Sequence, residues 1–146
     1  MKRRVEVIHG VNLGELGRRP LEHYGRITLP ELESAVRRFA SEIGLEAACS
    51  QTDHEGEFCE LLHRVPATTG GLILNPGAWT HYSYAIRDAL EIAALPAVEV
   101  HLSAVDERED WRRVSVIGDL CVATVQGKGV DGYREALELL RDRMAV

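Results

Sequence analysis

The sequence predicts an α/β fold of the flavodoxin-like, doubly wound type: a three-layer sandwich around a five-stranded parallel sheet. Five short apolar runs alternate with four segments of helical periodicity, which is the pattern of a sheet covered by helices. The runs are too apolar for half-exposed strands, which favours a parallel sheet buried on both faces. A length of 146 residues suits one domain, so residues 1–146 are expected to form a single unit.

The strands are expected where β-branched and small apolar residues cluster between turn signals. They cover VEVIH at 5–9, EAACSQ at 46–51, GGLILN at 70–75, AVEVHL at 97–102 and LCVATVQ at 120–126. The first helix is expected after Thr28, an N-cap residue with Pro30 in the first turn and Glu31 at capping-box spacing, and Gly44 ends it. The other helices are expected at 55–65, 81–94 and 132–144.

Net charge, apolar content and cysteine pattern indicate which partners and which cellular location to expect. The net charge of −6 makes nucleic acid and acidic membranes poor partners for the surface as a whole. The N-terminal segment MKRRVEVIHG lacks the apolar stretch of a signal peptide, and no run of about 18 apolar residues occurs, so we expect a cytoplasmic protein. Three cysteines without a C-x-x-C pair, Cys49, Cys59 and Cys121, are interpreted as reduced core thiols.

Two motifs suggest cofactors, and neither is complete. GKGVDG at 127–132 matches G-x-G-x-x-G, but only 14 residues follow it, too few for the strand and acidic residue that a dinucleotide site needs. These glycines are interpreted as a strand-to-helix turn. The acidic and histidine residues at 53–63 do not have metal-ligand spacing and are interpreted as a helix N-terminus. We therefore expect no metal and no cofactor.

Candidate functional residues follow the strands, because parallel α/β sheets bind ligands at the carboxyl ends of their strands. The turn NPGAWTH at 75–81 ends a buried strand and presents an amide, an indole and an imidazole. In the long loop at 10–25, Arg18 and Arg19 precede Tyr24, and an adjacent guanidinium favours a phenolate that can act as a base. The segment VEVHLS at 98–103 places Glu99 and His101 on one face of a strand.

Taken together, these segments resemble the type II 3-dehydroquinate dehydratases. The resemblance spans nearly the whole chain and is carried by VNLGELGRRPLEHYG, QTDHEG, LILNPGAWTHYSYAIRDAL, PAVEVHLS, EREDWRRVS and GKGVDGY. It implies trans-elimination of water from 3-dehydroquinate to 3-dehydroshikimate through an enolate, in the shikimate or quinate pathway. No metal, Schiff base or redox cofactor is implied.

The resemblance also implies roles for individual residues. Tyr24 matches the base, Arg19 the arginine that activates it, and Asn12 the asparagine that stabilises the enolate through a water molecule. His101 matches the general acid and Glu99 the carboxylate that orients it. The expected substrate-binding residues are Asn75, His81 and Arg112 at the ring hydroxyls, Ser103 with the adjacent backbone of Leu102 at the carboxylate, and Asp88, which reaches in from a neighbouring subunit. The implied assembly is a homododecamer built from trimers.

The chain departs from the family pattern around the substrate loops. The unusual residues are His9, Val11, Gly14, Glu15, Asp53, Ala104, Arg113 and Val114. They leave two alternatives open: dehydration of a dehydroquinate analogue, such as the amino-substituted one, or a catalytically inactive paralogue. A signalling receiver domain has similar architecture, but it needs a phosphorylatable Asp where Asn75 stands, and an amide cannot accept a phosphoryl group in that role.

Overall fold

The sheet has the strand order of flavodoxin-like proteins. The computed structural model describes residues 2–144, and within that range five parallel strands pair in the order β2-β1-β3-β4-β5. The strands are β1 (Arg4–His9), β2 (Glu46–Gln51), β3 (Gly71–Asn75), β4 (Ala97–His101) and β5 (Ala123–Gln126). The predicted α/β class and parallel sheet are confirmed.

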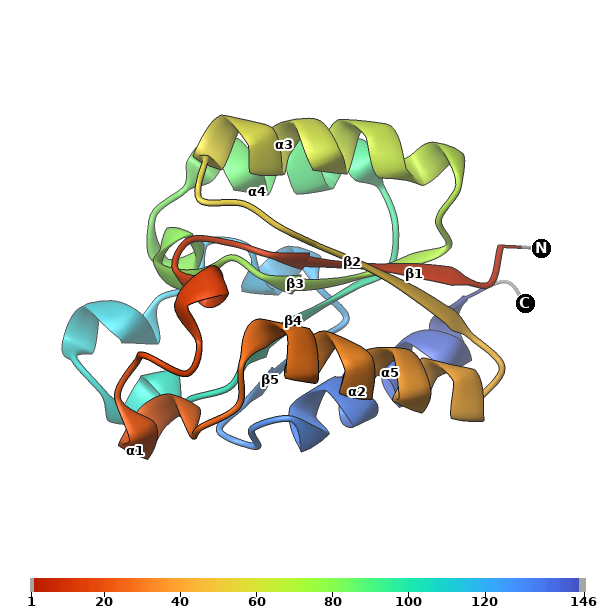
Figure 1. The fold of residues 1–146 in the computed structure, drawn as a ribbon. Helices are drawn as coiled ribbons and strands as arrows, with labels where there is room; N and C mark the ends of the chain where they lie inside the picture. Colours follow the sequence, from red (N-terminus) through yellow and green to blue (C-terminus); the bar gives the residue numbers. More distant parts are fainter. Residues whose placement is uncertain (1, 145–146) are drawn as a thin grey trace.

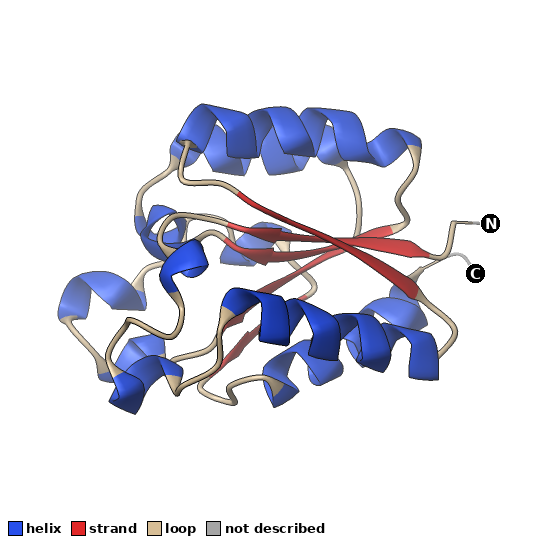
Figure 2. Ribbon diagram, viewed as in Figure 1, coloured by secondary structure: helices blue, strands red, loops and turns tan. Residues whose placement is uncertain are grey.

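Helices cover both faces of the sheet. The helices α2 (Leu29–Glu42) and α5 (Asp131–Arg143) lie on one face, and α3 (Glu55–Arg64) and α4 (Tyr84–Ala93) lie on the other (Figures 1 and 2). Each face has its own apolar cluster, because side chains alternate between the two sides of a strand: Val7 belongs to the α2/α5 cluster and Ile8 to the α3/α4 cluster.

Helix α2 begins where the sequence predicts. The Thr28 hydroxyl accepts a hydrogen bond from the Glu31 amide at 3.4 Å, and the Glu31 carboxylate accepts one from the Thr28 amide at 3.1 Å. This capping box satisfies two amide groups that the first helical turn leaves without partners. It fixes the end of the long loop that follows β1.

The predicted boundaries are wrong in two places. Residues 120–122 are not in a strand, because Gly118–Leu120 form a 3-10 turn and β5 starts only at Ala123. The helix expected to begin at residue 81 begins at Tyr84, since the Ser83 hydroxyl caps it by accepting from the Ile86 amide at 3.1 Å. His81 lies instead in the 3-10 turn Gly77–His81.

The edges of the sheet are more exposed than the apolar runs predict. Strands β2 and β5 are mostly half-buried, whereas β1, β3 and β4 are buried almost throughout. The cysteines are half-buried free thiols rather than core residues. Burial raises the pKa of Cys49 to about 11 and that of Cys121 to about 12, so both are poor nucleophiles at neutral pH.

Short helical turns lie in the loops at both ends of the strands. The four-residue helix α1 (Leu21–Tyr24) lies within the loop after β1. The other 3-10 turns are Leu13–Glu15, Val65–Ala67, Val105–Glu107 and Asp110–Arg113. In GKGVDG, Gly127 and Gly129 have φ of +74° and +56°, so these glycines do shape the turn from β5 to α5. Within residues 2–144, no helix is long and apolar enough to cross a membrane.

Candidate active site

A cavity opens at the carboxyl edge of the sheet, where the segments after β1, β3 and β4 meet. Its wall combines cationic, amide and imidazole groups with a few apolar side chains. The lining residues are Leu13, Arg19, Tyr24, Asn75, Gly77, Ala78, His81, His101, Leu102, Ser103, Val105, Arg108 and Arg112. Eight of the eleven residues expected to act on a substrate are therefore at this cavity.

The phenol oxygen of Tyr24 binds two guanidinium groups. Arg19 donates to it from Nη2 at 2.7 Å, and Arg108 donates from Nη1 at 2.7 Å. The Arg19 guanidinium carbon also lies 3.9 Å from the centre of the Tyr24 ring. Burial, together with the nearby cations Arg108 and Arg112, lowers the pKa of Arg19 against the attraction of Tyr24. The phenol oxygen of Tyr24 is therefore in contact with two cationic groups.

Arg108 is one cavity residue that the sequence analysis did not single out. It follows β4, 84 residues after Tyr24, and it also donates to the Ser103 hydroxyl at 3.2 Å. The sequence offers Arg108, Arg112 and Arg113 as equivalent candidates within one charged segment. Arg113 pairs with Asp110 at 3.6 Å and lines a neighbouring cavity, which it shares with His81, His101 and Arg112. Only the folded loop distinguishes them.

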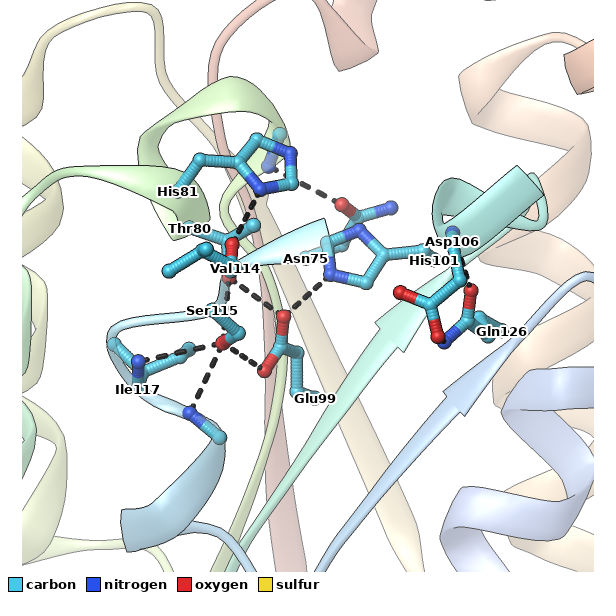
Figure 3. Close-up of polar contacts among 12 residues, drawn as sticks. Asn75, Thr80, His81, Glu99, His101, Asp106, Val114, Ser115, Ile117 and Gln126 are labelled. Atoms are coloured by element: carbon cyan, nitrogen blue, oxygen red, sulfur yellow. Dashed lines mark hydrogen bonds and ion pairs between the residues drawn. The ribbon is translucent and has the colours of Figure 1, made fainter. Parts of the chain in front are cut away.

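The second reactive pair is Glu99 and His101, which lie on the same side of β4 as predicted. His101 Nε2 lies 2.5 Å from Glu99 Oε2, and both side chains are buried. The Thr80 hydroxyl donates to Oε2 at 2.6 Å and the Ser115 hydroxyl donates to Oε1 at 2.7 Å (Figure 3). Sequence reasoning did not identify either hydroxyl as part of the site.

The charge state of Glu99 follows from these partners. Burial opposes its ionisation, but the hydrogen bonds from His101, Thr80 and Ser115 outweigh burial and hold the pKa of Glu99 below its ordinary value. A carboxylate that stays ionised fixes the orientation of the His101 ring through the contact with Nε2. The ring plane of His101 faces that of His81 at 6.5 Å between centroids (Figure 3).

The turn after β3 positions Asn75 and His81. The side-chain oxygen Oδ1 of Asn75 accepts from the Gly77 amide at 3.2 Å. Gly77 has φ of +67° in a place where a Cβ would lie 2.6 Å from the Val11 carbonyl oxygen. Glycine is therefore required there. His81 Nδ1 lies 2.7 Å from the Val114 carbonyl, so Nδ1 carries a hydrogen and Nε2 is left for a ligand.

The two histidines differ in environment. Burial lowers the pKa of His81, and the neighbouring His101 and Arg112 add to this effect against the contact with the Val114 carbonyl. His81 is therefore a neutral group at neutral pH. Trp79, from the same turn, is not at the cavity: it is buried and packs edge-on against Phe58 at 5.9 Å.

Arg112, Leu102 and Ser103 complete the cavity wall. Arg112 Nε lies 2.9 Å from a Glu109 carboxylate oxygen, and its guanidinium lies 4.1 Å from the Trp111 ring. Leu102 and Ser103 directly follow β4 and are buried. Together with Arg108, they form a polar part of the cavity wall that offers cationic, hydroxyl and backbone groups.

Two expected residues lie away from the cavity wall of a single chain. Asn12 is exposed in a left-handed conformation with φ of 69°, and its amide donates to Asp53 Oδ1 at 2.9 Å. Asp88 is exposed on α4. Glu99 lies behind His101 rather than on the wall. Among residues 2–144, no group of three or more His, Cys, Asp or Glu side chains is arranged to hold a metal ion.

Comparison with known proteins identifies close relatives along almost the whole chain. The model of the family described as "Dehydroquinase class II" matches residues 3–141. A 3-dehydroquinate dehydratase of Pelotomaculum thermopropionicum is 44% identical over 134 residues, covering 92% of this chain and 93% of that protein. A 3-dehydroquinate dehydratase of Thermotoga neapolitana is 46% identical over 135 residues, with 92% of each chain covered. The crystal structure of type II dehydroquinase from Propionibacterium acnes superposes with a TM-score of 0.91 at 36% identity, covering 97% of this chain and 98% of that one.

Proposed function

The chain belongs to the class II dehydroquinase family, and on that premise we propose how its own residues convert 3-dehydroquinate to 3-dehydroshikimate. The protein is a carbon–oxygen lyase that removes water from this substrate. The observation that carries the proposal is the juxtaposition, at one cavity, of a phenol oxygen bound by two guanidiniums and an imidazole held by an ionised carboxylate.

Tyr24 is the base in this proposal. Its phenolate removes a proton from the carbon next to the substrate ketone, and the electron pair moves onto the ketone oxygen to give an enolate. Two positive groups at 2.7 Å supply the stabilisation that a phenolate needs at neutral pH. One such charge at about 4 Å, with an effective dielectric constant of about 20, is worth on the order of 4 kcal/mol.

His101 is the acid that completes the elimination. When the enolate collapses, the carbon–oxygen bond to the leaving hydroxyl breaks, and the imidazolium donates its proton to that oxygen so that water departs. Glu99 keeps the ring oriented and charged before this step. Base and acid come from different segments, the loop after β1 and strand β4, and both line the same cavity.

The remaining groups bind the substrate. We assign Asn75, His81 and Arg112 to the ring hydroxyls, and Ser103 with the Leu102 backbone to the carboxylate. Asn12 stabilises the enolate oxygen through an ordered water. The support for Asn12 is its match to the family, together with its position at the start of the loop that carries Tyr24.

Helix α4 is the element on which we base a proposal for the assembly of the protein. We propose that the chain forms trimers that assemble into a homododecamer, in which Asp88 reaches the cavity of a neighbouring subunit. Helix α4 and the segment before it carry three exposed large side chains: Tyr82, Tyr84 and Ile92, which are 58%, 67% and 69% exposed. Large apolar side chains this exposed favour a covered surface. We also propose a cytoplasmic location.

The direct test is turnover of 3-dehydroquinate, followed by absorbance of the conjugated enone product. The purified chain should produce it, whereas the amino-substituted analogue should be a poorer substrate. An inactive wild-type chain, or a strong preference for the analogue, would contradict the assignment.

A further inference from the structure

A buried polar chain behind the active site joins His9, Tyr133 and Asn75. His9 ends β1, Asn75 ends the neighbouring β3, and the two are paired across the sheet. Tyr133 lies in the first turn of α5, and its hydroxyl is 2.9 Å from His9 Nε2 and 3.4 Å from Asn75 Nδ2. His9 and Tyr133 are fully buried, and of the three residues only Asn75 lines the cavity.

The direction of each hydrogen bond follows from the Gly77 backbone amide, which can act only as a donor. The Gly77 amide donates to Asn75 Oδ1, so the nitrogen of that carboxamide faces Tyr133. The Tyr133 oxygen therefore accepts from Asn75, and its own proton needs a different acceptor. His9 Nε2 is the acceptor within reach, which requires the neutral ring with its hydrogen on Nδ1.

The surroundings keep both partners uncharged. Burial lowers the pKa of His9 to about 4, against a smaller opposing contribution from the Ser50 backbone. Burial raises the pKa of Tyr133 far above its ordinary range, against the hydrogen bond from Asn75. This direction of hydrogen bonding requires that, at neutral pH, His9 is a neutral acceptor and Tyr133 a neutral phenol.

We propose that His9 and Tyr133 are positioning residues that fix the carboxamide of Asn75 with one nitrogen-bound hydrogen directed at the substrate. This inference rests on the proposed function, since it assigns Asn75 a substrate oxygen as its partner. With Oδ1 held by Gly77 and one Nδ2 hydrogen held by Tyr133, the second Nδ2 hydrogen remains for the ligand. The site thus selects an oxygen acceptor, a ring hydroxyl or an enolate oxygen, at this point.

The first test is Tyr133→Phe, which removes only the hydroxyl. We expect a rise in KM of about threefold to tenfold with a smaller change in kcat, as for loss of one neutral hydrogen bond that holds a binding group. Thr69→Val is the matched control, because it removes another fully buried hydroxyl beyond the opposite edge of the sheet. The control should leave KM unchanged. An unchanged KM in Tyr133→Phe would overturn the proposal.

A double-mutant cycle separates positioning from general packing. If Tyr133 acts through Asn75, then Tyr133→Phe should have little further effect on kcat/KM in an Asn75→Ala background. An equal loss in both backgrounds would contradict the proposed role. His9→Gln keeps an acceptor near the place of Nε2 and should retain a KM close to wild type, whereas His9→Leu should behave like Tyr133→Phe.

A spectroscopic test does not depend on turnover. In protein labelled with ¹⁵N-histidine, the His9 signals are identified by their loss in His9→Gln. They should show an unprotonated Nε2 at pH 7, and a protonated Nε2 would overturn the inference even in an active enzyme. A wild-type chain that fails to dehydrate 3-dehydroquinate but shows the expected His9 tautomer would instead contradict the proposed function.

Discussion

Arg108 and Tyr24 are separated by 84 residues in the chain, yet a 2.7 Å hydrogen bond joins them at the cavity. Arg19 binds the same phenol oxygen from within the same loop as Tyr24. Tyr24, the proposed base, therefore contacts one guanidinium from its own loop and one from the segment after β4. Each can be tested separately.

Tyr24→Phe should lower kcat by a factor on the order of 10² to 10⁴, with little change in substrate affinity, because the base is lost and the ring is kept. The decisive measurement is hydrogen exchange at the carbon next to the ketone. Exchange at the wild-type rate in this variant would place the base elsewhere.

Arg108→Ala should lower kcat through the same proton-removal step as Arg19→Ala, since each variant removes one cation from the phenol oxygen. We expect a loss of up to roughly a thousandfold for each, because one charge interaction of about 4 kcal/mol corresponds to a rate factor of that order. Arg112→Ala should instead raise KM as well. Arg18→Ala is the control, because its guanidinium is exposed, pairs with Glu15 and does not line the cavity. Full activity in Arg108→Ala would contradict its assigned role.

Glu99→Gln should reduce kcat at least about tenfold, because the imidazole loses the anion that favours its charged form. It should also change acid stability. The folded-state pKa of Glu99 lies below its ordinary value of 4.5, so its charge stabilises the fold fully above about pH 4.5. That contribution is lost as the pH falls through the folded-state pKa.

Urea unfolding at a series of pH values measures this effect. The difference in unfolding free energy between wild type and Glu99→Gln should be largest near pH 7 and shrink below pH 4.5. Glu138→Gln, at an exposed position on α5, should show no such trend. A difference that grows on acidification would have the wrong sign for a depressed pKa.

Asp88→Ala should raise KM if a neighbouring subunit contributes this carboxylate to the cavity. Wild type should sediment as a large oligomer, and the variant should keep that size. Glu91→Ala removes another exposed carboxylate of the same helix and serves as the control. A fully active monomer in sedimentation velocity would exclude a shared site.

Chelation with EDTA should leave turnover unchanged, and borohydride added with substrate should not inactivate the enzyme. Lysine occurs only at positions 2 and 128. Lys2 donates to the Pro66 carbonyl and Lys128 pairs with Glu135, each at 2.6 Å, and neither lines the cavity. Trapping of a reduced imine by mass spectrometry would contradict an enolate mechanism without a Schiff base.

Local patterns predicted most of the fold. The capping box at Thr28 and the alternation that places Glu99 beside His101 depend on residues two or three positions apart, and both are confirmed. The family resemblance is confirmed by the comparisons. The start of the strand predicted at 120–126 was wrong, because the 3-10 turn that begins at Gly118 and Asp119 extends to Leu120 and β5 begins only at Ala123.

The missed parts of the site are contacts between distant segments. Thr80 and Ser115 bind Glu99 from 19 and 16 residues away, and no spacing rule connects a strand carboxylate to such hydroxyls. Arg108 was indistinguishable from its neighbours for the same reason. The positions of Asn12 and Asp88 away from the cavity wall leave their roles as predictions.

His101 and Ser115, which flank residues 102–114, both bind the Glu99 carboxylate. Residues 102–114 therefore form a loop of thirteen residues whose two ends are held together by the Glu99 side chain. This loop carries Ser103, Arg108 and Arg112. Extending a loop whose ends are already fixed costs little, since doubling its length adds only about 0.6 kcal/mol of closure entropy. The interior of this loop can therefore be lengthened or substituted to admit other substrates, while His101 and Glu99 stay in place.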